Sequence, residues 1–160
     1  MLRFERSVVI RRPLDEVFAF LSDFANDAQW SGAVKEARQT SEGPVGVGTA
    51  VQQINEFMGR RVETRGVVTA FESRRSVCYR SEGAPIPHHE CRRFEQLPEG
   101  TRFTLVMEAE LTGVFRLAEG MARSAGERQL DADLATLVRL LEGGEQALRA
   151  ASPDRTPPAR

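Results

Sequence analysis

The chain has 160 residues, of which 41% are hydrophobic and 28% are charged, and its formal net charge is -1. This length fits a single domain, and the composition is that of a protein that folds into a core rather than one that stays disordered. The near-neutral charge lacks the positive field that draws proteins to polyanions, so no nucleic-acid partner is expected.

The first residues contain no apolar core of a signal peptide, and no run approaches the roughly 18 apolar residues that span a bilayer. We therefore expect a cytoplasmic protein without stable membrane insertion. Cys78 and Cys91 are the only cysteines. Two cysteines do not make a disulfide framework in a chain of this size, so free thiols are expected.

The first 30 residues predict a strand followed by two short helices. Residues 4–11 alternate around Val8 and Ile10, which is typical of a strand that ends before a proline. Pro13 then opens an amphipathic stretch with acidic residues in its first turn, as at a helix start. Asp23 is placed to cap a second short helix that runs towards Trp30.

From Val34 onward, short segments alternate with turn-forming residues such as Gly43-Pro44, Gly83-Ala84-Pro85 and Pro98-Glu99-Gly100. Turn-forming residues at such regular intervals predict a meander of antiparallel strands. The clearest strands cover residues 61–70 and 101–111, in which apolar and charged residues alternate. Each strand therefore has one buried face and one face in water.

After Gly113 the apolar period changes from two to three and four, which predicts a long amphipathic helix. Gly126 could mark a bend or a join within it, and Gly143-Gly144 are expected to end it. The predicted organisation is one ligand-binding domain over residues 1–145 and a flexible C-terminal tail over residues 146–160.

The order of strand, two short helices, about six strands and a long helix resembles the SRPBCC superfamily. That superfamily includes START domains, polyketide cyclase/dehydrase-like proteins and birch-pollen-allergen-like proteins. The resemblance runs from about Leu2 to Glu142. The short segments and single residues that carry it are residues 13–18, Leu21, Asp23, Trp30, 46–49, 100–101 and 137–142. The resemblance implies an α+β helix-grip fold, in which a bent antiparallel sheet of six to seven strands wraps round the C-terminal helix and encloses a cavity.

Such a cavity implies an apolar small-molecule site with a few polar groups. The residues expected to line it combine strand positions of the buried face with two methionines and one glycine that suit an irregular void. They are Trp30, Asn55, Thr64, Gly66, Val68, Tyr79, Arg92, Phe103, Leu105, Met107 and Met121. A solid core built from the same residues is the alternative.

Arg92 is the most informative polar candidate. If Phe94 points inward, the period of two turns Arg92 inward as well, where a guanidinium can bind a carboxylate or a phenolate. The alternative is that Arg92 pairs with Glu90 or reaches solvent. Tyr79 can donate a hydrogen bond to a ligand or to a backbone carbonyl.

His88 and His89 are the only histidines, and neighbours on a strand point to opposite faces, so they cannot chelate one ion together. His89 and Cys91 share a face, and Cys78 lies across the hairpin, but this spacing matches no familiar zinc motif. We therefore expect no metal, no cofactor and no identifiable catalytic residue.

The leading functional hypothesis is a carrier that sequesters a hydrophobic small molecule, such as a lipid, an isoprenoid, a quinone or a polyketide. The second is a polyketide cyclase/dehydrase-like enzyme that uses Arg92, Tyr79 or His88 to move protons. The third is an interaction module similar to the co-chaperone branch of the superfamily, with a collapsed cavity. The sheet edges and the exterior of the long helix could support a homodimer.

Overall fold

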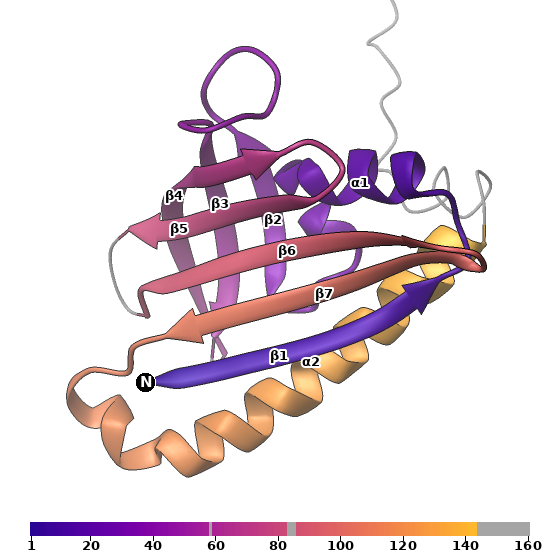
Figure 1. Cartoon of the computed structure of the whole chain (residues 1–160). Coiled ribbons are helices and arrows are strands. Elements are labelled where there is room, and N and C mark those ends of the chain that lie inside the picture. The colour runs from indigo at the N-terminus through magenta and orange to yellow at the C-terminus, as the bar shows by residue number, and fades with distance from the viewer. Residues whose placement is uncertain (58, 83–85, 144–160) are drawn as a thin grey trace, which may run out of the picture.

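The computed structural model describes residues 1–57, 59–82 and 86–143. Its centre is a seven-stranded antiparallel sheet with the strand order β1-β7-β6-β5-β4-β3-β2 (Figure 1). The strands are β1 (Leu2–Ile10), β2 (Val34–Gln39), β3 (Ala50–Phe57), β4 (Arg60–Glu72), β5 (Ser76–Glu82), β6 (His88–Leu97) and β7 (Gly100–Ala109). Only β1 joins its sheet neighbour over a long distance in sequence, and the other strands follow one another as the predicted meander.

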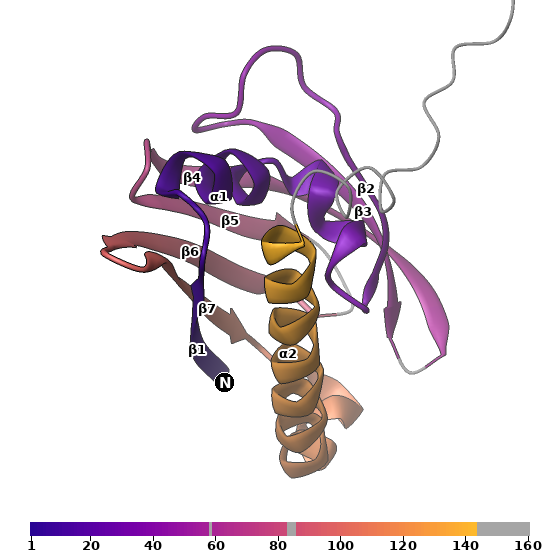
Figure 2. The ribbon, with the colours of Figure 1, turned by 90° about the vertical axis from the view of Figure 1, so that its right-hand side faces the viewer.

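The helices are α1 (Leu14–Ser22), η1 (Phe24–Gln29), η2 (Gly113–Ala118) and α2 (Glu119–Glu142). Figure 2 shows the sheet curled round α2, with α1 and η1 closing the gap between β1 and β2. The predicted helix-grip fold, with two short helices after the first strand, is confirmed. Among the described helices, none combines the length and the apolar character needed to cross a membrane.

The two short helices begin where the sequence predicts. Pro13 precedes α1 with φ -58°, and Asp15 and Glu16 lie in the first turn, where acidic side chains interact favourably with the helix dipole. The Asp23 carboxylate accepts a hydrogen bond from the backbone N–H of Ala25 at 3.0 Å and so caps η1. This segment brings residues 24–30 over the concave face of the sheet.

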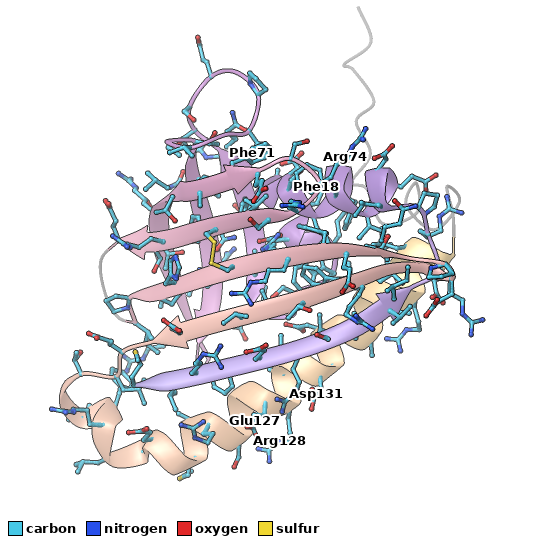
Figure 3. The ribbon with its side chains drawn as sticks, in the orientation of Figure 1. Phe18, Phe71, Arg74, Glu127, Arg128 and Asp131 are labelled. Atoms are coloured by element: carbon cyan, nitrogen blue, oxygen red, sulfur yellow. A yellow bond between two sulfur atoms is a disulfide. The ribbon has the colours of Figure 1, made fainter. Side chains whose placement is uncertain are left out.

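The concave face holds the hydrophobic core. Phe18 of α1 lies edge-on against Phe71 and Phe94, with ring centroids 5.7 and 5.2 Å away, and Figure 3 shows Phe18 beside Phe71. Phe94 in turn packs on Phe103, which is fully buried. The alternation predicted for the strands is therefore observed, and it separates this apolar interior from a charged exterior.

Helix α2 buries one stripe and exposes the rest. The stripe consists of Leu130, Asp133, Leu134, Leu137 and Leu141. On the side of β1, the Arg6 guanidinium reaches the carboxylates of Glu127 and Asp131, which Figure 3 labels on α2. Gly126 is not a join between two helices. The helix continues through it, and the missing side chain leaves room for the Phe4 ring of β1.

One cavity-lining expectation is wrong in its placement: the Met121 side chain is 79% exposed on the first turns of α2. The fully buried residues of α2 begin at Leu130, so the first turns of the helix extend beyond the concave face. The helical period alone cannot tell how far a helix overlaps the sheet that it packs on. The tail predicted for residues 146–160 lies outside the described residues.

The expectation of free thiols is also wrong, because Cys78 and Cys91 form a disulfide. The register of β5 and β6 places the two residues directly opposite each other, with Cα atoms 4.1 Å apart. Cysteine count and chain length say nothing about such a pairing, since it depends on which residues the hairpin register aligns.

Candidate functional site

A small cavity lies between the concave face of the sheet, the end of η1 and the second half of α2. Its volume is about 120 Å³. Its lining combines apolar side chains with polar and charged ones. The lining residues are Asp27, Trp30, Ser31, Ala33, Val34, Gln53, Asn55, His88, Glu90, Arg92, Leu105, Met107, Leu130 and Asp133.

Arg92 organises the polar side of this cavity. Its side chain is 1% exposed, and it donates two hydrogen bonds to the Asp27 carboxylate, at 2.9 and 2.7 Å. It also donates to the Glu90 carboxylate and, at 2.8 Å, to the backbone carbonyl of Leu21. The guanidinium carbon lies 4.2 Å from the centre of the Phe24 ring. A planar guanidinium held by two carboxylates and an aromatic ring has one fixed orientation.

Burial and charge act in opposite directions on this cluster. Burial raises the pKa of Asp27 from its ordinary 3.8 to about 6, although the charge of Arg92 and its hydrogen bonds act to lower it. For Arg92, burial acts to lower the pKa, but the charges of Asp27 and Glu90 raise it above its ordinary value. Arg92 therefore stays a cation, while Asp27 can exchange a proton near neutral pH.

Asp133 brings a further carboxylate to the cavity from α2. It accepts hydrogen bonds from the Ser31 hydroxyl at 3.1 Å, the Gly32 N–H at 2.9 Å and the Gln129 amide at 2.7 Å. These bonds tie the helix to the loop after η1. The cavity is thus lined by three carboxyl groups and one guanidinium, and its formal charge is negative when all of them are ionised.

Five of the residues predicted for the pocket do line the cavity: Trp30, Asn55, Arg92, Leu105 and Met107. The Trp30 indole N–H is buried and has no hydrogen-bond partner among the described residues. Asn55 donates to the Thr64 hydroxyl at 2.7 Å, and its amide oxygen accepts no hydrogen bond from the described side chains. Two of the lining residues thus have polar atoms available to another molecule.

Thr64, Gly66, Val68, Tyr79 and Phe103 lie on the concave face as predicted, but they pack into the core beside the cavity instead of lining it. Gly66 has a steric role there, since a Cβ atom would overlap the Tyr79 hydroxyl and the Arg80 carbonyl oxygen. Burial, followed by the charges of Glu90 and Asp27, raises the pKa of Tyr79 above its ordinary value. The phenol therefore stays protonated.

Two acidic residues of the site escaped the sequence analysis. Asp133 falls in the apolar stripe of α2, three residues after Leu130, and this position in the helical period signals an inward carboxylate. Asp27 carries a weaker signal: an arginine that the strand period turns inward needs a buried acid as its partner. Nothing in the sequence relates residue 27 to residue 92.

Comparison with known proteins places the chain in a family. Residues 1–142 match the family model described as polyketide cyclase / dehydrase and lipid transport. Among curated proteins, none matches the chain. Solved structures with the same fold include the Zhui aromatase/cyclase from a Streptomyces species. That structure is 20% identical, with a TM-score of 0.71 over 94% of this chain and 96% of its own.

Two further solved structures have similar scores. A protein from Thermus thermophilus is 19% identical, with a TM-score of 0.70 over 94% of this chain and 100% of its own. A START superfamily protein from Mycobacterium smegmatis is 17% identical, with a TM-score of 0.68 over 91% of this chain and 98% of its own. At these identities the structures establish a shared fold, and the family assignment follows from the model that spans residues 1–142. The chain is a member of the polyketide cyclase/dehydrase and lipid transport family.

Proposed function

We propose that this protein binds a small apolar molecule with a neutral polar end in the cavity between the sheet and α2, and acts as its carrier. The observation that carries the proposal is the pairing of an apolar wall with a buried donor. Leu105, Met107 and Leu130 form the wall, and the Trp30 indole N–H has no partner among the described residues. An unpaired buried donor costs free energy that a ligand carbonyl or hydroxyl oxygen recovers.

The charges of the cavity support a neutral polar end rather than an anionic one. The Arg92 guanidinium already binds Asp27 and Glu90, so a ligand carboxylate would have to displace one of them and would face Asp133. Taking an unpaired negative charge into such a site is costly. Isoprenoid alcohols, quinones and polyketide-like carbonyl compounds fit this requirement better than free fatty acids do.

The size of the cavity sets a second requirement. Sites for drug-sized ligands measure roughly 300–1,000 Å³, and this cavity measures about 120 Å³. A ligand of ordinary size therefore widens the cavity as it enters. Met107 is one adaptable part of the wall, because methionine changes shape at little cost.

A cyclase-type enzyme is the second candidate, and one observation favours it. Asp27 lines the cavity, and its pKa of about 6 suits a group that accepts and returns a proton near neutral pH. Arg92 and Tyr79, whose pKa values are raised, hold their protons too firmly for that role. In this candidate Asp27 moves the proton and Arg92 orients it.

Native mass spectrometry of freshly purified protein, followed by extraction of any bound compound, is the first test. Trp30 is the only tryptophan in the chain, so its fluorescence reports on titrations with candidate quinones and isoprenoid alcohols. We expect saturable binding with one site per chain and no chemical change in the ligand. Slow conversion of a bound polyketide would favour the enzyme instead. Native spectra also report a homodimer, should the edge strands β1 and β2 support one.

Ala33 and Ala37, four residues apart in sequence, provide a matched pair of substitutions that tests where the ligand binds. Ala33 lines the cavity, whereas Ala37 lines a separate hollow with Glu36 and Arg38. Ala33→Phe should fill the cavity and weaken binding at least about tenfold, and Ala37→Phe should leave it unchanged. Equal binding by both folded variants would place the ligand elsewhere. The cytoplasmic location stays a prediction, which fractionation of producing cells tests.

A further inference from the structure

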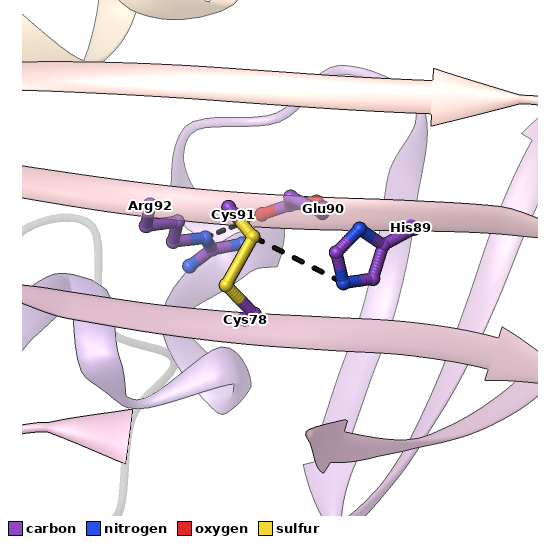
Figure 4. Close-up of a disulfide and its surroundings, with 5 residues drawn as sticks. All are labelled: Cys78, His89, Glu90, Cys91 and Arg92. Atoms are coloured by element: carbon purple, nitrogen blue, oxygen red, sulfur yellow. Dashed lines mark hydrogen bonds and ion pairs between the residues drawn. A yellow bond between two sulfur atoms is a disulfide. The ribbon is translucent and has the colours of Figure 1, made fainter. Parts of the chain in front are cut away.

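Three potential metal ligands lie together on the convex face of the sheet. The register of β5 and β6 aligns Cys78 with Cys91, and His89 precedes Cys91 by two residues on the same face. One ligand atom from each residue, two Sγ atoms and one imidazole nitrogen, lies within 4.8 Å of the others. Figure 4 shows the three side chains gathered on one side of the strand pair.

This cluster is separate from the cavity and open to solvent. Glu90 and Arg92, which alternate with His89 and Cys91 along β6, point to the other face of the sheet (Figure 4). All three residues of the cluster are partly exposed. Reductants and metal ions can therefore reach the cluster without entering the cavity.

The spacing suits a small tetrahedral ion. With Zn–S bonds of about 2.3 Å and Zn–N bonds of about 2.0–2.1 Å, a tetrahedral zinc site holds its sulfur and nitrogen ligands about 3.6 Å apart. The Cys91 Sγ and His89 Nε2 atoms lie 3.9 Å apart. Two cysteine thiolates and an imidazole form a ligand set that zinc prefers, and a fourth position remains for water.

We propose that the reduced form of this protein binds one Zn²⁺ through Cys78, Cys91 and His89. A dithiol or phosphine reductant supplies two electrons, and the disulfide takes up two protons as its S–S bond breaks, which gives two thiols. Zinc binding then releases those two protons and forms two Zn–S bonds and one Zn–N bond. The disulfide and the metal site exclude each other, because both use the same two sulfur atoms.

Zinc titration of the reduced full-length protein against a chromophoric chelator, under anaerobic conditions with a phosphine reductant, tests the proposal. We expect one Zn²⁺ per reduced chain and none in the oxidised protein. Co²⁺ in place of Zn²⁺ should give a thiolate charge-transfer band. A reduced protein that binds no Zn²⁺ overturns the proposal.

The two adjacent histidines provide a matched control. His88 faces the cavity, where its Nδ1 atom lies 3.0 Å from the Ser81 hydroxyl. Loss of a residue that only supports a zinc ligand already costs about 10–100-fold in affinity. His89 is proposed as a ligand itself, so His89→Asn should weaken zinc binding at least about tenfold. His88→Asn should leave the zinc affinity unchanged. Equal affinity in the wild type and the His89→Asn variant overturns the three-residue site.

Cys91→Ser should abolish binding, provided that its circular dichroism and melting show a folded protein. X-ray absorption of the zinc-loaded wild-type protein covers the case in which it does not fold. The proposal requires two sulfur ligands and at least one nitrogen ligand. A coordination shell of oxygen and nitrogen alone overturns it.

Discussion

Arg92 carries a full charge at a position that is 1% exposed, and the residues around it offset most of the cost. Its hydrogen bonds to Asp27, Glu90 and the Leu21 carbonyl occupy donors on every side of the guanidinium. Such a buried cluster rarely adds stability compared with apolar residues of the same size. Its presence at the cavity therefore points to a role in shaping the site.

Asp27→Asn tests whether burial or the ion pair with Arg92 controls the pKa of the Asp27 carboxyl group. Because burial raises the pKa of Asp27 in the folded protein to about 6, against 3.8 ordinarily, the folded state binds more protons than the unfolded state between these values. Its stabilising contribution is thus complete below about pH 4 and is lost as the pH rises through 6. The difference in unfolding free energy between wild type and Asp27→Asn should fall over this interval, by at most about 1.4 kcal/mol per pH unit.

Urea unfolding of both proteins at several pH values between 4 and 7 measures this difference. Groups that titrate alike in the two proteins cancel. A difference that rises with pH would mean that the ion pair with Arg92, rather than burial, dominates the pKa of Asp27 and holds it below its ordinary value. The proton-transfer role considered for Asp27 would then lose its support.

Prediction of single residues from the sequence succeeds where the alternation of side chains along one strand decides which face a residue lies on. The inward direction of Arg92 follows from its distance of two residues from Phe94, and it is observed. The pairing of Arg92 with Glu90, the alternative interpretation of the sequence, is observed as well. The Asp27 partner of Arg92 and the disulfide bond of Cys78 do not follow, because they depend on the path of η1 and on the exact register between strands. Asp27 lies 65 residues from Arg92 in sequence, and Cys78 lies 13 residues from Cys91.

At the scale of elements, the two halves of α2 differ in how much surface they bury. Its second half buries an apolar stripe, whereas Met121 near its start and Leu117 of η2 are exposed. The periodicity of the sequence runs evenly through both halves and so predicts one amphipathic helix that is buried throughout. The overlap with the sheet ends near Gly126, where the Phe4 ring of β1 takes the place of a side chain.

Two glycines of α2 test this contact. Replacing a helical glycine with alanine usually stabilises a protein by about 0.4–1 kcal/mol. Gly120→Ala should give this gain, because a Cβ at Gly120 meets no atom within 4 Å. Gly126→Ala should give a smaller gain or a loss, since the new Cβ would lie 2.8 Å from the buried Phe4 ring.

Thermal and urea unfolding of the two variants under identical conditions compare the effects directly. Helix propensity acts on both substitutions with the same sign, so their difference isolates the contact with β1. Equal gains would show that α2 can move away from β1 at little cost. The position of the helix over the cavity would then be loosely determined.

At the scale of the whole molecule, the sequence predicts the fold well and the interior poorly. The order of elements sets the fold, because a meander that follows two short helices and precedes a long helix has few ways to bury its apolar faces. The volume left inside depends on side-chain packing to within a methylene group, which no period encodes. Five of the eleven predicted lining residues face the cavity, five more pack into the core beside it, and Met121 is exposed on α2.

A cavity of about 120 Å³ that admits a larger ligand requires one wall to move, and the walls differ in how firmly they are held. The sheet side is fixed by continuous strand pairing, and the second half of α2 is fixed by its buried stripe and by the hydrogen bonds of Asp133. Met121 and Leu117, by contrast, bury little surface. The segment before Leu130 does not itself line the cavity, but it is the part of α2 that detaches at the lowest cost and so opens the cavity at its Leu130 end.

Hydrogen exchange followed by mass spectrometry tests this distribution of stability. Amides of residues 119–125 should exchange at least about tenfold faster than those of residues 130–141, because a local opening of the first part exposes little apolar surface. A bound ligand should slow exchange most in residues 119–129 and least in β6 and β7. Uniform protection along α2 would contradict this mechanism. The entrance would then lie at the start of β2 and near the end of β3, where Val34 and Asn55 line the cavity.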